Sequence, residues 1–573
     1  MTWHTAWPAW RSGPWSLDLR DDELADIAYE GRVALRSIRA VVRDREWATA
    51  AFTVDRIDST ATTATLHVRT TELGFDLRGS VHVEVDATSA LRVSLDLETA
   101  ADVDTNRTGL VVLHPAGVAG CPLEVIHASG PVEHSEFPAE ISAHQPAFDI
   151  AGLGWIVDGL AVDLRFSGDV FEMEDQRNWS DASFKTYSRP LALPFPYRLA
   201  AGSRIRQSVE MRAAVVAAST PAGSGTITLA ESGVFPDIVV GAATAPDPAP
   251  VADRLGAAVL VELDLASSAW HAALDRAARS GQPLDVRFVL ADDDPDALFA
   301  AAGALRDLDV RRVAAFQRSG DARHVSDAAA VDLLRRALAA AGETIPIVGG
   351  ARSHFTELNR ERHRLPDDLD GLVFSTTPLF HARGTEQLVE SLAMQRLIVE
   401  QAVRLAGALP VHVGPIALRP RFNDAATTPP PMPAHADLRD GYGPALIDAD
   451  DERQDAPELA AWTIASAAAL AVPGTASIAF FEEWGPRGVR SSDGADRAVA
   501  DAVRALDALR GARLLHGASP DGLVWAIGGL LPDGTETILV ANVDRRERAI
   551  TVRTPRTDLS AELPAGSWST RRA

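Results

Sequence analysis

Two short segments combine carboxylates with polar and aromatic residues in a pattern that suits acid–base chemistry. Residues 350–360 (GARSHFTELNR) contain Glu357, and residues 480–485 (FFEEWG) contain Glu483 beside Trp484. Two carboxyl groups that face each other can act as a general acid and as a base or nucleophile. The tryptophan offers an apolar platform that raises a carboxyl pKa or stacks on a sugar face. We therefore predict that Glu357 and Glu483 are catalytic.

Both carboxylates also have plainer interpretations. Glu357 could cap a helix or pair with Arg360, and Glu483 could be a charge on a rim. Because side chains alternate along a strand, Glu482 would point away from the side that Glu483 occupies. The sequence leaves open which of the two points inward.

A further polar segment, residues 171–187 (FEMEDQRNWSDASFKTY), contains Lys185, the only lysine of the chain. A strand cannot bury so many polar groups unless they form a network. Two interpretations stand side by side. The segment could reach over the mouth of a catalytic domain and bind substrate hydroxyls, or it could be a hydrogen-bonded latch between domains.

The residues that we predict to bind substrate lie in these segments or directly after predicted strands. They are Glu262, Arg352, His354, Asn359, His381, Trp484, Asp175, Asn178 and Lys185.

The spacing of residues gives little support for a metal site, a nucleotide-binding site or a catalytic serine. His354, His381 and His412 fall near three predicted strand ends and, with a glutamate, could bind Zn²⁺. The sequence has no HxH or HExxH spacing, so we predict no metal and no other cofactor. It also lacks a G-x-S-x-G elbow, a P-loop and a dinucleotide fingerprint.

The elements that must position these residues change character near residue 220. Before it, segments such as 79–86 (GSVHVEVD) and 91–97 (LRVSLDL) alternate apolar and polar residues, which predicts a large antiparallel β-sandwich. Residues 513–573 return to this period and predict a small C-terminal β-domain.

Between these regions, eight apolar runs alternate with helical patterns, as in a (β/α)8 barrel, whose active site lies at the carboxyl ends of its strands. The runs are 238–244, 258–264, 284–290, 310–316, 345–350, 372–377, 411–416 and 477–483. A long loop at 420–457 follows the seventh run, and loops of that length are often functional. The predicted architecture is thus α/β plus all-β, with a sandwich at 1–220, a catalytic barrel at 221–512 and a β-domain at 513–573.

Composition narrows the class of protein. The 573 residues carry a net charge of −24, which disfavours nucleic acid and anionic membranes as partners. Cys121 is the only cysteine, so no disulfide forms within the chain. We read neither a signal peptide nor a transmembrane segment, and we expect a cytoplasmic protein. The oligomeric state stays open.

Three stretches resemble the D-apionate lactonase family, and the resemblance extends over nearly the whole chain. They are residues 172–187 (EMEDQRNWSDASFKTY), 110–130 (LVVLHPAGVAGCPLEVIHASG) and 349–360 (GGARSHFTELNR). The resemblance implies hydrolysis of D-apionolactone to D-apionate in D-apiose catabolism. We carry over no catalytic residues from the family to this sequence. The barrel is also similar to that of retaining glycoside hydrolases, which place two glutamates on strands four and seven, whereas Glu357 and Glu483 follow the fifth and eighth runs.

Three hypotheses follow for the function. The leading one is a sugar-lactone hydrolase in which a glutamate in the barrel mouth activates water and Arg352, Asn359, His381 or Lys185 stabilises the oxyanion. The alternative is a glycoside hydrolase that uses the two glutamates. A non-catalytic carbohydrate-binding protein is the third. In each case the partner is a small sugar lactone or saccharide.

Overall fold

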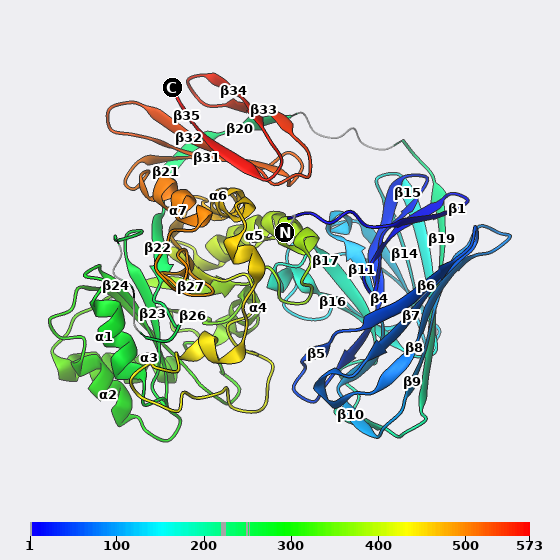
Figure 1. The fold of residues 1–573 in the computed structure, drawn as a ribbon, viewed down its shortest axis with the longest axis horizontal. Helices are drawn as coiled ribbons and strands as arrows, with labels where there is room; N and C mark the ends of the chain where they lie inside the picture. Colours follow the sequence, from blue (N-terminus) through cyan, green and yellow to red (C-terminus); the bar gives the residue numbers. More distant parts are fainter. Residues whose placement is uncertain (1–2, 219–224, 248–249, 251–252) are drawn as a thin grey trace.

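The computed structural model describes residues 3–218, 225–247, 250 and 253–573. Figure 1 shows three regions: a large curved sheet from the N-terminal part, a barrel with its helices, and a small β-region that lies on the barrel. The predicted boundary at 220/221 lies outside the described residues.

The N-terminal strands join into one 17-stranded antiparallel sheet that encloses a single apolar core. In β9 (Leu91–Thr99) every second residue is buried, as the alternation predicts. The antiparallel β-domain is therefore confirmed, although its strands form one continuous sheet rather than two separate ones. The other strands of this sheet are β1 (Ala9–Ser12), β2 (Trp15–Arg20), β3 (Glu23–Tyr29), β4 (Arg32–Arg43), β5 (Thr49–Ala50), β6 (Thr53–Ser59), β7 (Thr63–Thr70), β8 (Leu77–Val85), β11 (Arg107–Pro115), β12 (Pro122–His127), β13 (Val132–Glu136), β14 (Ala147–Val157), β15 (Leu160–Ser167), β16 (Phe171–Asp175), β17 (Ser183–Ser188) and β19 (Arg204–Val215).

The sheet has a second, outer face that carries charged residues. Strands β4, β11, β17 and β16 lie side by side, and on their outer face Val41, Val111, Leu113 and Tyr187 form a small apolar patch. This face is turned toward the barrel and forms one wall of the cavity described below (Figure 1).

Eight parallel strands form the predicted barrel, in the order in which they follow one another along the chain. The ring closes between the fourth and fifth strands through the pairing of Val313 with Ile347. Each predicted apolar run overlaps one strand, so the (β/α)8 architecture is confirmed. The strands are β22 (Asp237–Gly241), β23 (Val259–Asp264), β24 (Leu284–Val289), β25 (Val310–Phe316), β26 (Val348–Gly350), β27 (Gly371–Thr376), β28 (Val411–Ile416) and β29 (Thr475–Glu482).

Helices follow most barrel strands and cover the outside of the ring. They are α1 (Trp270–Ala278), α2 (Asp296–Gly303), α3 (Ala328–Ala341), α4 (Phe355–Glu361), α5 (Thr385–Ala406), α6 (Glu458–Leu470) and α7 (Ala498–Asp507). None of the helices in the described ranges is both long and apolar enough to cross a membrane.

The C-terminal β-region packs on the barrel helices rather than standing apart. Every residue of α6 after Glu458 is buried, and Trp462 of α6 shares one apolar core with Trp525, Ile527 and Leu539 of the C-terminal strands. Two short strands that precede the barrel also pair with this region. The strands of the region are β20 (Thr226–Thr228), β21 (Ala230–Val234), β30 (Arg513–His516), β31 (Val524–Leu530), β32 (Glu536–Asn542), β33 (Arg548–Arg553), β34 (Asp558–Leu563) and β35 (Ser567–Arg572).

We predict that Trp462→Ala destabilises the protein by about 3–5 kcal/mol, because it leaves a cavity in the core that joins the barrel to the C-terminal strands. Trp462 is fully buried, and its Nε1 donates to the carbonyl of Leu388 at 2.7 Å. Urea denaturation measures the change. The control is Phe148→Ala, at a side chain that is 53% exposed, which should change stability by less than about 0.5 kcal/mol. Equal effects of the two substitutions would contradict this prediction.

Candidate active site

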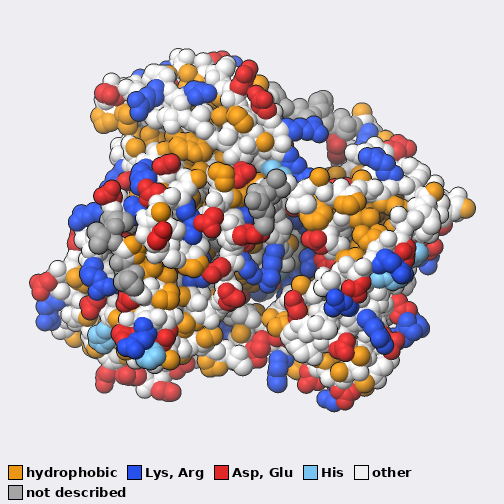
Figure 2. Space-filling view, in the orientation of Figure 1, with side chains coloured by type: hydrophobic (Ala, Val, Ile, Leu, Met, Phe, Trp, Pro, Cys, Tyr) orange, Lys and Arg blue, Asp and Glu red, His pale blue; other side chains and the backbone are white. Residues whose placement is uncertain are grey.

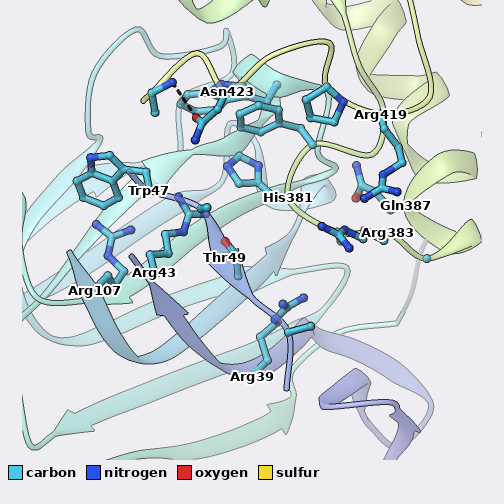
Figure 3. Close-up of a pocket in the computed structure, with 18 of the residues that line it drawn as sticks. Arg39, Arg43, Trp47, Thr49, Arg107, His381, Arg383, Gln387, Arg419 and Asn423 are labelled. Carbon is cyan, nitrogen blue, oxygen red and sulfur yellow. Dashed lines mark hydrogen bonds between the residues drawn. The ribbon is translucent and has the colours of Figure 1, made fainter. Parts of the chain in front are cut away.

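Two cavities lie at the carboxyl-end face of the barrel. The larger, of about 1230 Å³, lies between the outer face of the N-terminal sheet and the loops after β27 and β28, and we call it the interdomain cavity. The smaller, of about 390 Å³, lies over the barrel strands, and we call it the mouth cavity. Figure 2 shows the surface hollowed between the two lobes, with Lys and Arg side chains in the hollow. Figure 3 shows the residues that line the interdomain cavity from both sides.

Glu357 lies on the first turn of α4, and its half-buried side chain lines the interdomain cavity. Its Oε2 accepts hydrogen bonds from Ser353 Oγ at 2.5 Å and from the backbone N–H of His354 at 3.2 Å. Burial and the negative charge of Asp424 raise the pKa of Glu357 to about 7. A carboxyl with such a pKa can take up and release a proton near neutral pH, as a general base must.

One of the plainer interpretations of Glu357 also holds, because its bond to the His354 N–H caps α4. The other does not hold: Arg360 donates through Nε to the carbonyl of Ala143 at 2.8 Å instead of pairing with Glu357. Glu357 thus caps a helix and faces a cavity at the same time.

Asp424, in the long loop after β28, is the carboxylate next to Glu357. Its Oδ2 lies 3.3 Å from His354 Nδ1. Burial favours the neutral form of Asp424, but the hydrogen bond and charge of His354 outweigh burial and lower its pKa. Asp424 therefore keeps the negative charge of the pair, and Glu357 is the group of the pair that takes up a proton near neutral pH.

His354, Glu357 and Asp424 are also the residues that could hold a metal ion. Each offers one ligand atom, and these atoms lie within 4.8 Å of one another. His354 Nε2 and Asp424 Oδ1 are buried and have no hydrogen-bond partner among the described residues. The three-histidine site considered from the sequence is not assembled, since His412 lies near the amino end of β28 and bonds Ser477.

Two buried pairs from the 171–187 segment flank this cluster. His381 lines the interdomain cavity, and its Nδ1 lies 2.7 Å from Asp181 Oδ2. Burial lowers the pKa of His381 well below its usual value, so the ring is neutral. Lys185 forms an ion pair with Glu174, whose side chain lines the same cavity. The positive charge of Lys185 outweighs the burial of Glu174 and holds the pKa of that carboxyl well below its usual range.

The other part of this segment is a latch. Asn359 Nδ2, on α4, donates to Asn178 Oδ1 and to the carbonyl of Ile141, both at 3.1 Å. Asn178 Nδ2 donates to the backbone carbonyls of Ser142 and Asp175. The carboxylate of Asp175 forms an ion pair with Arg177. The latch interpretation holds at Asn178, which joins the N-terminal domain to Asn359 of the barrel. Glu174 of the same segment lines the cavity, and binding of substrate hydroxyls by the segment stays a prediction.

Glu262 and Arg352 lie together in the other cavity, in the barrel mouth. Arg352 binds Glu262 with Nε at 3.2 Å and Nη2 at 2.5 Å, and Arg421 lies 3.4 Å from the same carboxylate. Burial favours the neutral form of Glu262, but the charges of Arg352 and Arg421 outweigh burial and bring its pKa to about 2. Glu262 is therefore a permanent charge and not a base near neutral pH.

Glu482 rather than Glu483 lines the mouth cavity. Its carboxylate accepts from the N–H and Oγ1 of Thr244 and from Arg487. Glu483 and Trp484 are not among the described residues that line either cavity. Burial raises the pKa of Glu483 to about 7, and Trp484 packs against Ala243 under the guanidinium of Arg276. The structure does not bring Glu357 and Glu483 together in one cavity.

Sequence reasoning did not single out several residues of the interdomain cavity or of its buried pairs. Among them are Arg39, Arg43, Arg107, Glu174, Asp181 and Asp424. The sequence did point to the region of Asp424, because this residue lies at the start of the long loop after the seventh strand. Nothing in the sequence pointed to Arg43 and Arg107, since strand arginines are ordinary on the outside of a β-domain.

The chain matches two family descriptions along most of its length. Residues 2–215 match "D-apionate lactonase, N-terminal domain", and residues 238–512 match "D-apionate lactonase, TIM barrel domain". A protein named D-apionate lactonase from Brucella anthropi is 30% identical over 463 residues, which cover 72% of this chain and 73% of the relative.

Solved structures resemble the fold at low identity. SrfJ from Salmonella typhimurium has a TM-score of 0.40 and 12% identity and covers 63% of this chain and 95% of its own. A GH30 endoxylanase from Clostridium papyrosolvens C71 has a TM-score of 0.40 and 10% identity and covers 61% of this chain and 98% of its own. It is the sequence matches that decide the family: this chain belongs to the D-apionate lactonase family.

Proposed function

We propose that this chain hydrolyses a sugar lactone, D-apionolactone, to the corresponding acid, D-apionate. The relative from Brucella anthropi, which is named D-apionate lactonase, carries the proposal. A cavity with a carboxyl group of pKa about 7 beside polar and cationic side chains supports it. The substrate class is thus a small sugar-derived molecule.

In the reaction that we propose, the ionised carboxylate of Glu357 accepts a proton from a water molecule in the interdomain cavity. The resulting hydroxide equivalent attacks the lactone carbonyl, and a tetrahedral oxyanion forms. When the ring C–O bond breaks, protonated Glu357 returns the proton to the leaving alkoxide, so that a hydroxy acid is released. Positioned acid–base catalysis of this kind contributes roughly 10²–10⁴-fold.

The neighbours of Glu357 suit these steps. The negative charge of Asp424 keeps Glu357 basic, and Ser353 holds the carboxylate in one orientation. His381, neutral and bonded to Asp181 through Nδ1, can accept a hydrogen bond from a sugar hydroxyl through Nε2. Arg352 and Glu262 line the mouth cavity and not the cavity of Glu357, so we assign them no step in this reaction.

The geometry favours a lactonase over a retaining glycosidase, which needs two carboxyl groups about 5–5.5 Å apart on either side of one substrate. Glu357 lines the interdomain cavity and Glu483 does not. The fourth and seventh strands are followed by Gln317 and Ala417, so neither supplies a carboxylate at that position.

The first test is Glu357→Gln, which should lower kcat for D-apionolactone about 10²–10⁴-fold. Glutamine can still cap α4 at this position, so the fold should be retained. Proton release followed with a pH indicator measures the rate above spontaneous hydrolysis. The matched control is Glu361→Gln on the same helix, which should stay within a few-fold of wild type. Near-wild-type activity of Glu357→Gln would remove Glu357 as the base, and an equal loss in Glu483→Gln would restore the paired-glutamate mechanism.

The second test is the pH profile. Because Glu357 must be ionised to accept a proton and its pKa is about 7, kcat/KM should rise about tenfold per pH unit below pH 7 and level off above it. Rates are corrected for spontaneous hydrolysis at each pH. A profile that is flat between pH 5 and about pH 8 would contradict the role of Glu357.

The third test separates carboxylate catalysis from metal catalysis. The mechanism above routes no step through a metal, so dialysis against EDTA should leave kcat/KM unchanged. If activity is lost and a divalent cation restores it, His354, Glu357 and Asp424 act as ligands and the attacking water is metal-bound.

A further inference from the structure

Two arginines oppose each other on the cavity wall that the N-terminal sheet provides. The antiparallel register of β4 and β11 places Arg107 directly across from Arg43. Like charges directly opposite each other on neighbouring strands are destabilising. Arg39 lies on the same face of β4, four residues before Arg43, and all three line the interdomain cavity (Figure 3).

None of these three guanidinium groups has an ion pair or a hydrogen bond to another described residue. Their Nε atoms are buried without a partner. Arg107 is buried, and Arg39 and Arg43 are half-buried. Two buried arginines elsewhere in the described chain are paired, Arg177 with Asp175 and Arg276 with Asp247. Removing a guanidinium from water without a counter-ion is costly, so a cluster of such groups on a cavity wall suits an anionic ligand.

Ring contacts hold Arg107 in one orientation. Arg107 is 4% exposed, and its guanidinium carbon lies 3.6 Å from the ring centre of Tyr187 and 5.4 Å from that of Trp47. Tyr187 is itself fixed, because its hydroxyl donates to the carboxylate of Glu172. Contacts to the faces of the rings fix the plane of the guanidinium and leave its N–H edge for a ligand.

Glu174, a carboxylate of the same wall, already has another partner. Glu174 is committed to Lys185, on the neighbouring strand. Burial and the charge of Arg107 lower the pKa of Arg43 to about 10, and burial lowers the pKa of Lys185 to about 8, with Arg43 and Arg107 adding to the effect. The cations of this wall thus repel one another when no anion is bound.

We infer that Arg39, Arg43 and Arg107 form a carboxylate-binding site that receives the acid group of the aldonate after the ring opens. This inference rests on the function proposed above, because hydrolysis converts a neutral lactone into a carboxylate. The negative charges of Asp424 and Glu357 repel that new carboxylate from the place where it forms. Planar guanidinium groups bind a carboxylate with two parallel hydrogen bonds. The enzyme therefore binds its product more tightly than a neutral sugar of the same size, and the product inhibits it.

Calorimetric titration with D-apionate tests this site without turnover. Wild type should bind D-apionate, and Arg43→Met and Arg107→Met should each weaken binding about 10- to 100-fold. The alditol with the same carbon skeleton should bind weakly and equally to all variants. Arg78→Met, an exposed arginine on β8, is the control for loss of one positive charge and should leave affinity unchanged.

Thermal unfolding gives a second readout that a merely structural arginine would not produce. Without ligand, Arg43→Met should be as stable as wild type or more so, because it removes a repulsion. D-apionate should raise the midpoint of unfolding of wild type and raise that of Arg43→Met much less. A ligand-free Arg43→Met that is clearly less stable than wild type, with the same response to D-apionate, would overturn the inference.

The possible results separate this inference from the proposed function. If the protein hydrolyses the lactone but Arg43→Met and Arg107→Met both bind D-apionate as wild type does, the carboxylate site is overturned and the proposed function is not. Inorganic phosphate binding as tightly as D-apionate, with the same dependence on Arg43, overturns the assignment of the site to the product. Arginine-dependent binding of D-apionate without hydrolysis of any lactone leaves an anion receptor and overturns the proposed function.

Discussion

The contact between the N-terminal domain and helices α4 and α5 of the barrel is the constraint on which the candidate site depends. This contact is polar: Asn178 bonds Asn359, Arg360 bonds the carbonyl of Ala143, and Arg36 of β4 bonds Glu390 of α5 at 2.7 Å. Such bonds are directional, so they set the spacing of the two regions as well as holding them. The interdomain cavity is the space that this spacing leaves, with the arginines on one wall and Glu357 on the other.

The electrostatics of the cavity arise because its walls hold buried ionisable groups that are not all paired with an opposite charge. Glu357 and Asp424 are close enough that both cannot be ionised cheaply, and the hydrogen bond from His354 decides that Asp424 keeps the charge. On the opposite wall Arg43 and Arg107 are cations without carboxylate partners. One wall thus holds a group that takes up protons and the other holds unpaired positive charge. The lactone hydrolysis that we propose turns a neutral ester into an anion, and in this proposal it uses both walls.

A local irregularity of the backbone explains why Glu482, and not Glu483 as predicted, faces the barrel mouth. The pairing of β22 with β29 shifts register between Val240 and Gly241, and Phe481 adopts a left-handed backbone with φ of 52°. A bulge of this kind reverses the alternation of side chains for the residues that follow. Glu482 therefore turns into the barrel mouth and meets Thr244 and Arg487, while Glu483 turns away.

The sequence by itself determined the elements. Period-two segments such as β9 and eight apolar runs separated by helical patterns predicted the N-terminal β-domain and the barrel, because burial patterns along one element depend only on nearby residues. It also singled out Glu357, as a carboxylate just after a barrel strand. Only the tertiary structure decided which carboxylates face one another. Asp424 reaches Glu357 through a loop some 60–70 residues further on, and Arg107 meets Arg43 through a strand pairing of similar sequence separation. Such contacts are set by the packing of whole regions, which no local pattern records, and they carry the chemistry proposed for this protein.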